Sequence, residues 1–243
     1  MIFDKVFCIL CVLVSSFLQQ IDAASFRGDL KHTQEIFTPT EQWAVDRIYD
    51  GLHAIDTLCR KNGIEYALTG GTLLGSYWYG GLIPWDDDAD ISMLEEDVRK
   101  FLRLSQELRE YGFEIIPSEW GYYISPIDGI PTRKGQKYPS IDLFALKLRD
   151  GKYFSASDRA FAHWPNEYFT KKEWASITDV TFGHLILRGH TGKYAERMLT
   201  TTYGSDWKEV AAVWWDHKNE RPLEKVYVRL ADRAHATHSG FKK

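Results

Sequence analysis

Apolar residues recur at helical spacing over the first half of the chain. Trp43, Ile48, Leu52, Ile55 and Leu58 are three to five positions apart, which places them on one face of an α-helix. This pattern predicts one long helix, capped by Thr38 or Thr40 and ended by Asn62–Gly63. A second amphipathic repeat, "EEDVRKFLRLSQELREYG", predicts a single helix that ends at Gly112, and "TGKYAERMLTTTYG" predicts a last helix from about Thr191.

Shorter apolar runs between these helices are typical of β-strands. The segment "IEYALTGG" predicts a short buried strand, "GTLLGSYWYGG" a short helix or turn, and "DADISML" a strand because its polar and apolar residues alternate. Three further segments predict strands, the last of them running into a hairpin: "FEIIPS", "GYYISPI" and "IDLFALKLRDGKYF". This order predicts a mixed α/β (α+β) fold followed by an irregular C-terminal region.

The two ends of the chain differ from the middle. Residues Val6 to Leu18 form a short apolar run, and Ala23, Ala24 and Ser25 follow it, as in a secretory signal peptide. We therefore predict a signal peptide over residues 1–24, with a short uncleaved anchor as the alternative, and contact with a membrane only in that second case. A single domain over residues 25–229 and a flexible polar tail over residues 230–243 complete the predicted organisation. The expected location is the secretory pathway, either secreted or in the Golgi or ER lumen.

The composition of the chain argues against nucleic acid as a binding partner. The net charge is −4 and no dense run of Lys and Arg occurs, so the basic surface of a nucleic-acid-binding protein is missing. Aromatic residues make up 14% of the chain, with nine Trp, which favours a tightly packed core or an aromatic-lined cleft.

Aspartates are unusually dense in the segment "GGLIPWDDDADISM". Asp88 and Asp90 would point to the same side of a strand, so both carboxylates could reach one cation. Asp86 shares that side if the strand extends back to it, whereas Asp87 would point away. A third acid, Asp142, lies in the apolar strand "SIDLFAL", where a carboxylate is costly unless it is paired or bound to a metal.

Glycines and basic residues near these acids fit a phosphate group. Gly70 and Gly71 allow backbone N–H groups to approach a phosphate closely, and Thr72 begins a helix-like turn. Arg133 and Lys137, before Asp142, could also hold a phosphate. The glycine pair, the two strand acids and Asp142 together predict a metal-dependent phosphoryl-transfer site that uses Mg²⁺ or Mn²⁺.

Other interpretations of the same residues remain open. Asp86, Asp88 and Asp90 match the first ligands of an EF-hand calcium loop, although Ile91 replaces its required glycine. The acids could also form a solvated turn. Asp142 could simply pair with Arg133 or Lys147, and the basic residues could form a solvated loop face.

The stretch "LTGGTLLGSYWYGGLIPWDDDADISM" closely resembles the signature of the LicD family, which includes fukutin and the fukutin-related protein. Two later segments resemble further family elements, "YPSIDLF" at residues 138–144 and "YGSDW" at residues 203–207. The resemblance implies a nucleotidyltransferase-like mixed sheet with flanking helices. It also implies transfer of a phospho-alcohol group, such as phosphocholine or ribitol phosphate, from a CDP-type donor to a glycan hydroxyl.

By this resemblance, Asp88, Asp90 and Asp142 would be the metal-binding acids, and Gly70, Gly71 and Thr72 the loop that cradles the donor phosphate. One departure stands out, because many relatives carry an arginine where this chain has Trp78. An arginine can clamp a phosphate with two hydrogen bonds and a tryptophan cannot. The alternative function is therefore a secreted, non-catalytic binding protein of the same fold.

Overall fold

The computed structural model describes residues 39–133, 135–219, 221–229 and 234–240. The predicted signal peptide or anchor lies outside the described residues. No helix in the described part of the chain combines the length and apolar character needed to cross a membrane.

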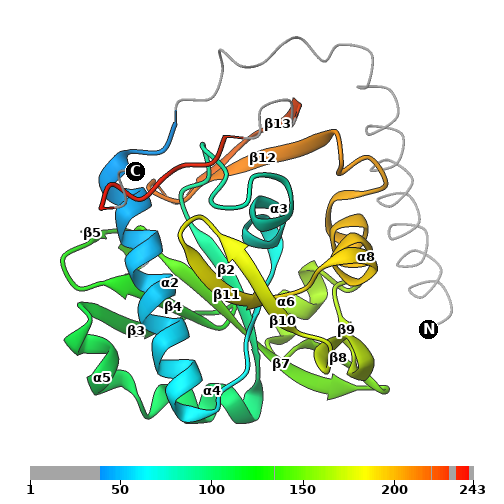
Figure 1. Ribbon diagram of the computed structural model, residues 1–243, viewed down its shortest axis with the longest axis horizontal. Helices are drawn as coiled ribbons and strands as arrows, with labels where there is room; N and C mark the ends of the chain where they lie inside the picture. Colours follow the sequence, from blue (N-terminus) through cyan, green and yellow to red (C-terminus); the bar gives the residue numbers. More distant parts are fainter. Residues whose placement is uncertain (1–38, 134, 220, 230–233, 241–243) are drawn as a thin grey trace, which may run out of the picture.

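A mixed β-sheet forms the centre of the described fold (Figure 1). Strands β1, β2, β7, β4 and β3 are hydrogen-bonded in that order, and β8 joins β7 to β9. The bounds are β1 (Ala67–Leu68), β2 (Ala89–Leu94), β3 (Phe113–Pro117), β4 (Tyr122–Pro126), β7 (Ile141–Arg149), β8 (Lys152–Ser155) and β9 (Phe169–Thr170). Strands β2 and β7 run parallel, and the other pairs in this sheet are antiparallel.

Three two-stranded sheets and seven helices complete the described part of the chain. The small sheets pair β5 (Ile130–Pro131) with β6 (Lys137–Tyr138), β10 (Thr178–Phe182) with β11 (Leu185–Gly189), and β12 (Val210–Asp216) with β13 (Arg221–Arg229). The helices are α2 (Gln42–Asn62), α3 (Gly70–Trp78), α4 (Glu95–Leu102), α5 (Ser105–Glu110), α6 (Asp158–His163), α7 (Lys171–Trp174) and α8 (Gly192–Tyr203).

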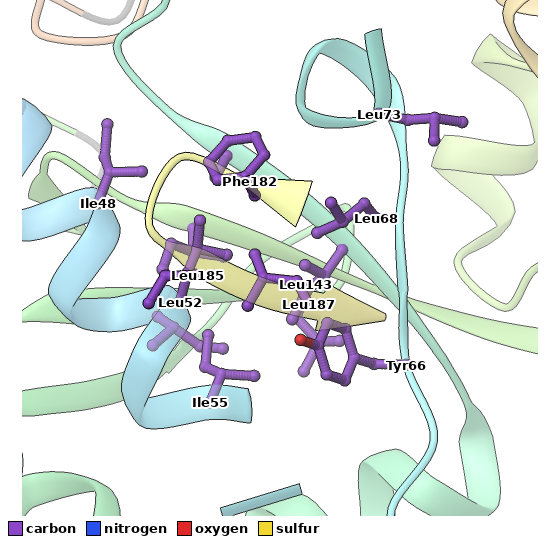
Figure 2. Packing of buried hydrophobic residues seen from close by; sticks show 14 of the residues in the cluster. Ile48, Leu52, Ile55, Tyr66, Leu68, Leu73, Leu143, Phe182, Leu185 and Leu187 are labelled. Carbon is purple, nitrogen blue, oxygen red and sulfur yellow. The ribbon is translucent and has the colours of Figure 1, made fainter. Parts of the chain in front are cut away.

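The core lies between α2 and the sheets. Ile48, Leu52 and Ile55 of α2 are buried in one cluster with Leu143 of β7 and Leu187 of β11, and Figure 2 shows these side chains converging from separate elements. The predicted apolar face of the first helix is thus the face that packs on the sheet. The helix ends at Asn62, as predicted, and Gly63 after it has a left-handed conformation.

Two details of the helix predictions are wrong. Glu41, not a threonine, precedes the first turn of α2, and the Thr40 hydroxyl instead donates to the backbone oxygen of Asp86 over 2.8 Å. The predicted single helix after β2 is divided into α4 and α5 by a tight turn at Arg103 and Leu104. This turn allows both Phe101 and Leu108 to be fully buried.

Described residues near the end of the chain form regular contacts. The predicted irregular region contains the β10–β11 and β12–β13 hairpins. Residues 234–240, inside the predicted flexible tail, lie beside the start of α2 (Figure 1), where His238 contacts Asp50 over 2.8 Å. Ala236 also forms a bridge with Leu82, so this segment contacts the loop that leads to the acidic residues.

Candidate active site

Two parallel strands position the acidic residues. Asp90 of β2 and Asp142 of β7 are register partners, so their backbones lie side by side and their side chains leave the same face. Asp88 comes just before β2, where the N–H of Ala89 donates to the backbone oxygen of Ser140 over 3.3 Å. The pairing of β2 with β7 therefore brings together acids that are more than fifty positions apart in the sequence.

Asp88, Asp90 and Asp142 form a cluster whose carboxylate oxygens lie within 4.8 Å of one another. Asp88 is 7% exposed, and the other two are half-buried. A solvated acidic turn does not describe this arrangement. An EF-hand is also excluded, because β2 begins at Ala89, inside the segment that would be the calcium loop, and pairs with β1 and β7.

The electrostatics of the cluster favour a bound cation. Burial raises the pKa of Asp90 well above its ordinary value, and the charges of Asp88 and Asp142 raise it further. Burial, with the charges of Asp88 and Asp87, does the same to the pKa of Asp86. Carboxylate oxygens are the ligands that Mg²⁺ and Mn²⁺ prefer, so the three acids fit a divalent cation that would neutralise this repulsion.

The start of α3 lies against these acids. The N–H of Gly71 donates to Oδ2 of Asp90 over 3.3 Å. Gly70 has a positive φ, and a Cβ added there would lie 2.3 Å from the same oxygen. At Gly71 an added Cβ would lie 2.7 Å from a carboxylate oxygen of Asp86. Glycine is needed at both positions because the carboxylates approach so closely.

Thr72 has a different position from the one the resemblance implied. Its side chain is fully buried, and its hydroxyl accepts a hydrogen bond of 2.7 Å from the backbone N–H of Asp90. It does not line the cavity described below. Thr72 therefore fixes the start of β2 beneath the acids.

His217 and Asp87 are site residues that the sequence interpretation missed. Nδ1 of His217 lies 2.7 Å from Asp87, and Nε2 lies 3.2 Å from Asp88. Burial alone would lower the pKa of His217, but the charges of Asp88 and Asp87 raise it well above its ordinary value. Asp87 does not point away as predicted, because the β12–β13 hairpin carries His217 onto it. These three residues also place ligand atoms within 4.8 Å of one another.

A cavity of about 840 Å³ opens beside the acids. Gly70, Gly71, Asp86, Asp87, Asp88, Asp90, Asp142 and His217 form one part of its wall. Aromatic residues form much of the rest, from several elements: Trp85, Trp120, Tyr123, Phe144, Trp164, Tyr168, Phe169, Tyr203 and Trp215. The high aromatic content of the sequence thus supplies both the core and a cleft.

Three of the residues singled out in the sequence lie outside this wall. Arg133 and Lys137 do not line the cavity, and Lys137 instead contacts Glu114 and the backbone oxygen of Ile127. Trp78, at the end of α3, packs against the main core and does not line the cavity either. Trp78, the residue that differs from the family signature, therefore lies outside the wall of the candidate active site.

The fold and site define a mixed α/β domain with an acidic cluster at one end of an aromatic-walled cavity. A family model described as "LicD/FKTN/FKRP, nucleotidyltransferase domain" matches residues 63–188. The chain belongs to this family, as the sequence resemblance indicated. The matched region contains α3, β2 and β7, and with them the acidic cluster.

Three curated relatives show how far this similarity extends. An uncharacterized protein of Rickettsia typhi is 26% identical over 142 residues, 58% of this chain and 41% of its own length. One of Rickettsia prowazekii is 23% identical over 176 residues, 72% of this chain and 60% of its own. The lipopolysaccharide cholinephosphotransferase LicD of Haemophilus influenzae is 42% identical over 65 residues, 26% of this chain and 23% of its own. The chain thus aligns with 60% or less of the length of each relative.

Solved structures give weaker matches. The crystal structure of ANT(2″)-Ia in complex with adenylyl-2″-tobramycin is 14% identical with a TM-score of 0.36, over 59% of this chain and 67% of that one. An antigenic nucleotidyltransferase-like protein from Paracoccidioides brasiliensis is 14% identical with a TM-score of 0.35, over 63% of this chain and 64% of that one.

Proposed function

We propose that this protein is a metal-dependent transferase that moves a phospho-alcohol group from a CDP-type donor to a glycan hydroxyl in the secretory pathway. The observation that carries the proposal is the convergence of Asp88, Asp90 and Asp142 at the wall of the cavity. Family membership supports the same class of reaction, as does the similarity to a cholinephosphotransferase over part of the chain. The apolar run near the N-terminus supports the location.

The residues of the site have separate tasks in such a transfer. Asp88, Asp90 and Asp142 would hold Mg²⁺ or Mn²⁺, which would neutralise negative charge on the oxygens of the donor phosphates. Gly70 and Gly71 let the first turn of α3 lie against the carboxylates of Asp90 and Asp86, so a donor phosphate bound to the cation would lie close to the start of this helix, which favours an anion. The aromatic wall would contact the apolar faces of the donor or the glycan and exclude water.

A transfer assay tests this proposal. The chain is incubated with Mn²⁺ and a panel that includes CDP-choline and CDP-ribitol, with water as the acceptor, and release of CMP is measured. We expect turnover with at least one donor, abolition by chelation, and a loss of about a hundredfold or more in Asp88→Asn. No binding or turnover of any donor by the wild-type chain would refute the proposal.

The alternative, a non-catalytic binding protein, was motivated by Trp78. The position of this residue outside the cavity wall weakens that motivation. The variant Trp78→Arg distinguishes the transferase from the non-catalytic binding protein. If the wild-type chain binds no donor and the arginine restores binding, the alternative is favoured, whereas turnover by the wild-type chain eliminates it.

A further inference from the structure

Glu167 is a carboxylate of the cavity wall that stands apart from the aspartate cluster. It lies between α6 and β9, where its backbone N–H donates to the backbone oxygen of Trp164 over 3.2 Å. Its side chain is half-buried and lines the cavity. None of the tasks assigned above uses this carboxylate.

The cationic neighbours in the cavity wall are engaged by other acids. Arg197 pairs with Glu173, and Arg159 pairs with Glu119. The partner that the structure gives to Glu167 is the hydroxyl of Thr202, near the end of α8. Burial raises the pKa of Glu167 above its ordinary value, and the hydrogen bond from Thr202 opposes that rise.

The position of Tyr203 relates Glu167 to the aspartates. Burial raises the pKa of Tyr203 well above its ordinary value, and the charges of Asp90, Asp86 and Glu167 raise it further. Tyr203 directly follows Thr202 in the chain and lines the same cavity as Glu167, Asp86 and Asp90. A substrate held at the cluster therefore occupies the cavity whose wall includes Glu167.

A phosphoryl transfer to an alcohol needs a group that accepts the proton of that alcohol. Asp88, Asp90 and Asp142 are poor candidates, because a divalent cation would engage their oxygens and lower their basicity. Asp87 pairs with His217, Asp86 lies against Gly71 beside the cluster, and Glu119 pairs with Arg159. Among the described carboxylates of the wall, Glu167 is the one that stands apart from the cluster and whose partner in the structure is a hydroxyl.

We propose that Glu167 is the general base of the transfer, an inference that rests on the proposed function. As the acceptor oxygen forms a bond to the attacked phosphorus, its proton moves to the Glu167 carboxylate. The phosphoanhydride P–O bond breaks, and its electron pair leaves with the CMP. The products are a phosphodiester, CMP and a protonated Glu167, which returns its proton to solvent.

The test compares Glu167→Gln with the wild-type full chain in Mn²⁺, with CDP-choline and CDP-ribitol as donors and water as acceptor. Release of CMP gives kcat and KM across a pH series. We expect kcat to fall about a hundredfold or more with both donors, while KM stays within about threefold. The low-pH decline of kcat should disappear in the variant. Glu110→Gln, on the exposed surface of α5, is the matched control and should behave as wild type.

Different outcomes separate the explanations. If Glu167→Gln keeps kcat within about threefold of an active wild type, the inference is wrong and the proposed function stands. If KM rises only for CDP-choline, Glu167 binds the trimethylammonium group instead, which also overturns the inference. A wild type inactive with every donor removes the proposed function and this inference with it. If Glu167→Gln fails to fold, Glu167→Asp replaces it, and a general base predicts a partial loss of kcat with the pH profile retained.

Discussion

At the scale of single residues, Gly70 shows why the family signature needs glycine. Its φ is +52° and a Cβ there would lie 2.3 Å from Oδ2 of Asp90, so a side chain would strain the backbone and displace a carboxylate of the cluster.

The variant Gly70→Ala should therefore lose both stability and metal affinity. We expect a cost of about 1–2 kcal/mol in the free energy of unfolding from the left-handed backbone, and at least about a tenfold loss of Mn²⁺ affinity as Asp90 moves. Urea denaturation and calorimetry measure the two effects.

Gly63→Ala is the matched control for this prediction. Gly63 also has a positive φ, +61°, but nothing lies within 4 Å of the added Cβ. It should show a similar loss of stability with unchanged Mn²⁺ affinity. Equal losses of affinity in both variants would contradict the role given to Gly70.

The residues of the site were predictable to the extent that strand geometry determines them. Alternation along the predicted strand singled out Asp88 and Asp90 but wrongly turned Asp87 away from the site. The cost of a lone acid in an apolar strand singled out Asp142. His217 was missed because its contact with Asp87 joins positions 130 residues apart. No local pattern signals such a contact. Arg133 and Lys137 were chosen by closeness in sequence to Asp142, and the chain turns them elsewhere.

At the scale of elements, helices and strands with a clear apolar period were predicted well. The long helix, the paired glycines at the start of α3 and the strands around Asp90 and Asp142 follow from local pattern and burial. The division between α4 and α5 was missed because the apolar repeat continues through the turn. The β12–β13 hairpin was missed because its pairing depends on two segments that each give only a weak signal.

His190 connects the elements behind the aromatic wall and gives a prediction about pH. It is 2% exposed, and its Nε2 lies 2.9 Å from the backbone oxygen of Glu173. Burial lowers its pKa below the ordinary 6.5, although the hydrogen bond to Glu173 opposes this. Since the folded pKa is lowered, the unfolded chain binds the proton more readily.

The contribution of His190 to stability should thus be fully present above pH 6.5 and be lost as the pH falls through the lowered pKa. Urea denaturation between about pH 7.5 and about pH 5 measures the loss. His190→Gln, which keeps an N–H donor without titrating, should lose less stability as the pH falls. His184 contributes in the same direction, because burial and His238 lower its pKa. Asp86, Asp90 and His217 contribute in the opposite direction, because their pKa values are raised. The difference between the two profiles, and not the slope of either one, therefore reports on His190. An unchanged slope in the variant would contradict this account.

At the scale of the whole molecule, the fold brings the acids, the glycine turn and the aromatic wall to one cavity. The segment 234–240 and α2 hold the loop before the acids from outside: Tyr49 accepts from the N–H of Leu82 over 3.1 Å and donates to Ala236 over 3.1 Å. Family membership accounts for the shared core of this arrangement. Trp85, Phe144 and Tyr203 of the aromatic wall lie in the three segments that resemble the family, whereas Trp120 and Trp164 come from segments outside them.

We propose that Asp88, Asp90 and Asp142 together hold a divalent cation. Calorimetric titration of Mn²⁺ into the full chain, beside Asp88→Asn and Asp142→Asn, measures this binding. We expect saturable binding to the wild-type chain and a loss of at least about a hundredfold in affinity in each variant. Equal affinity in the wild type and both variants, or no binding to the wild type, would contradict it.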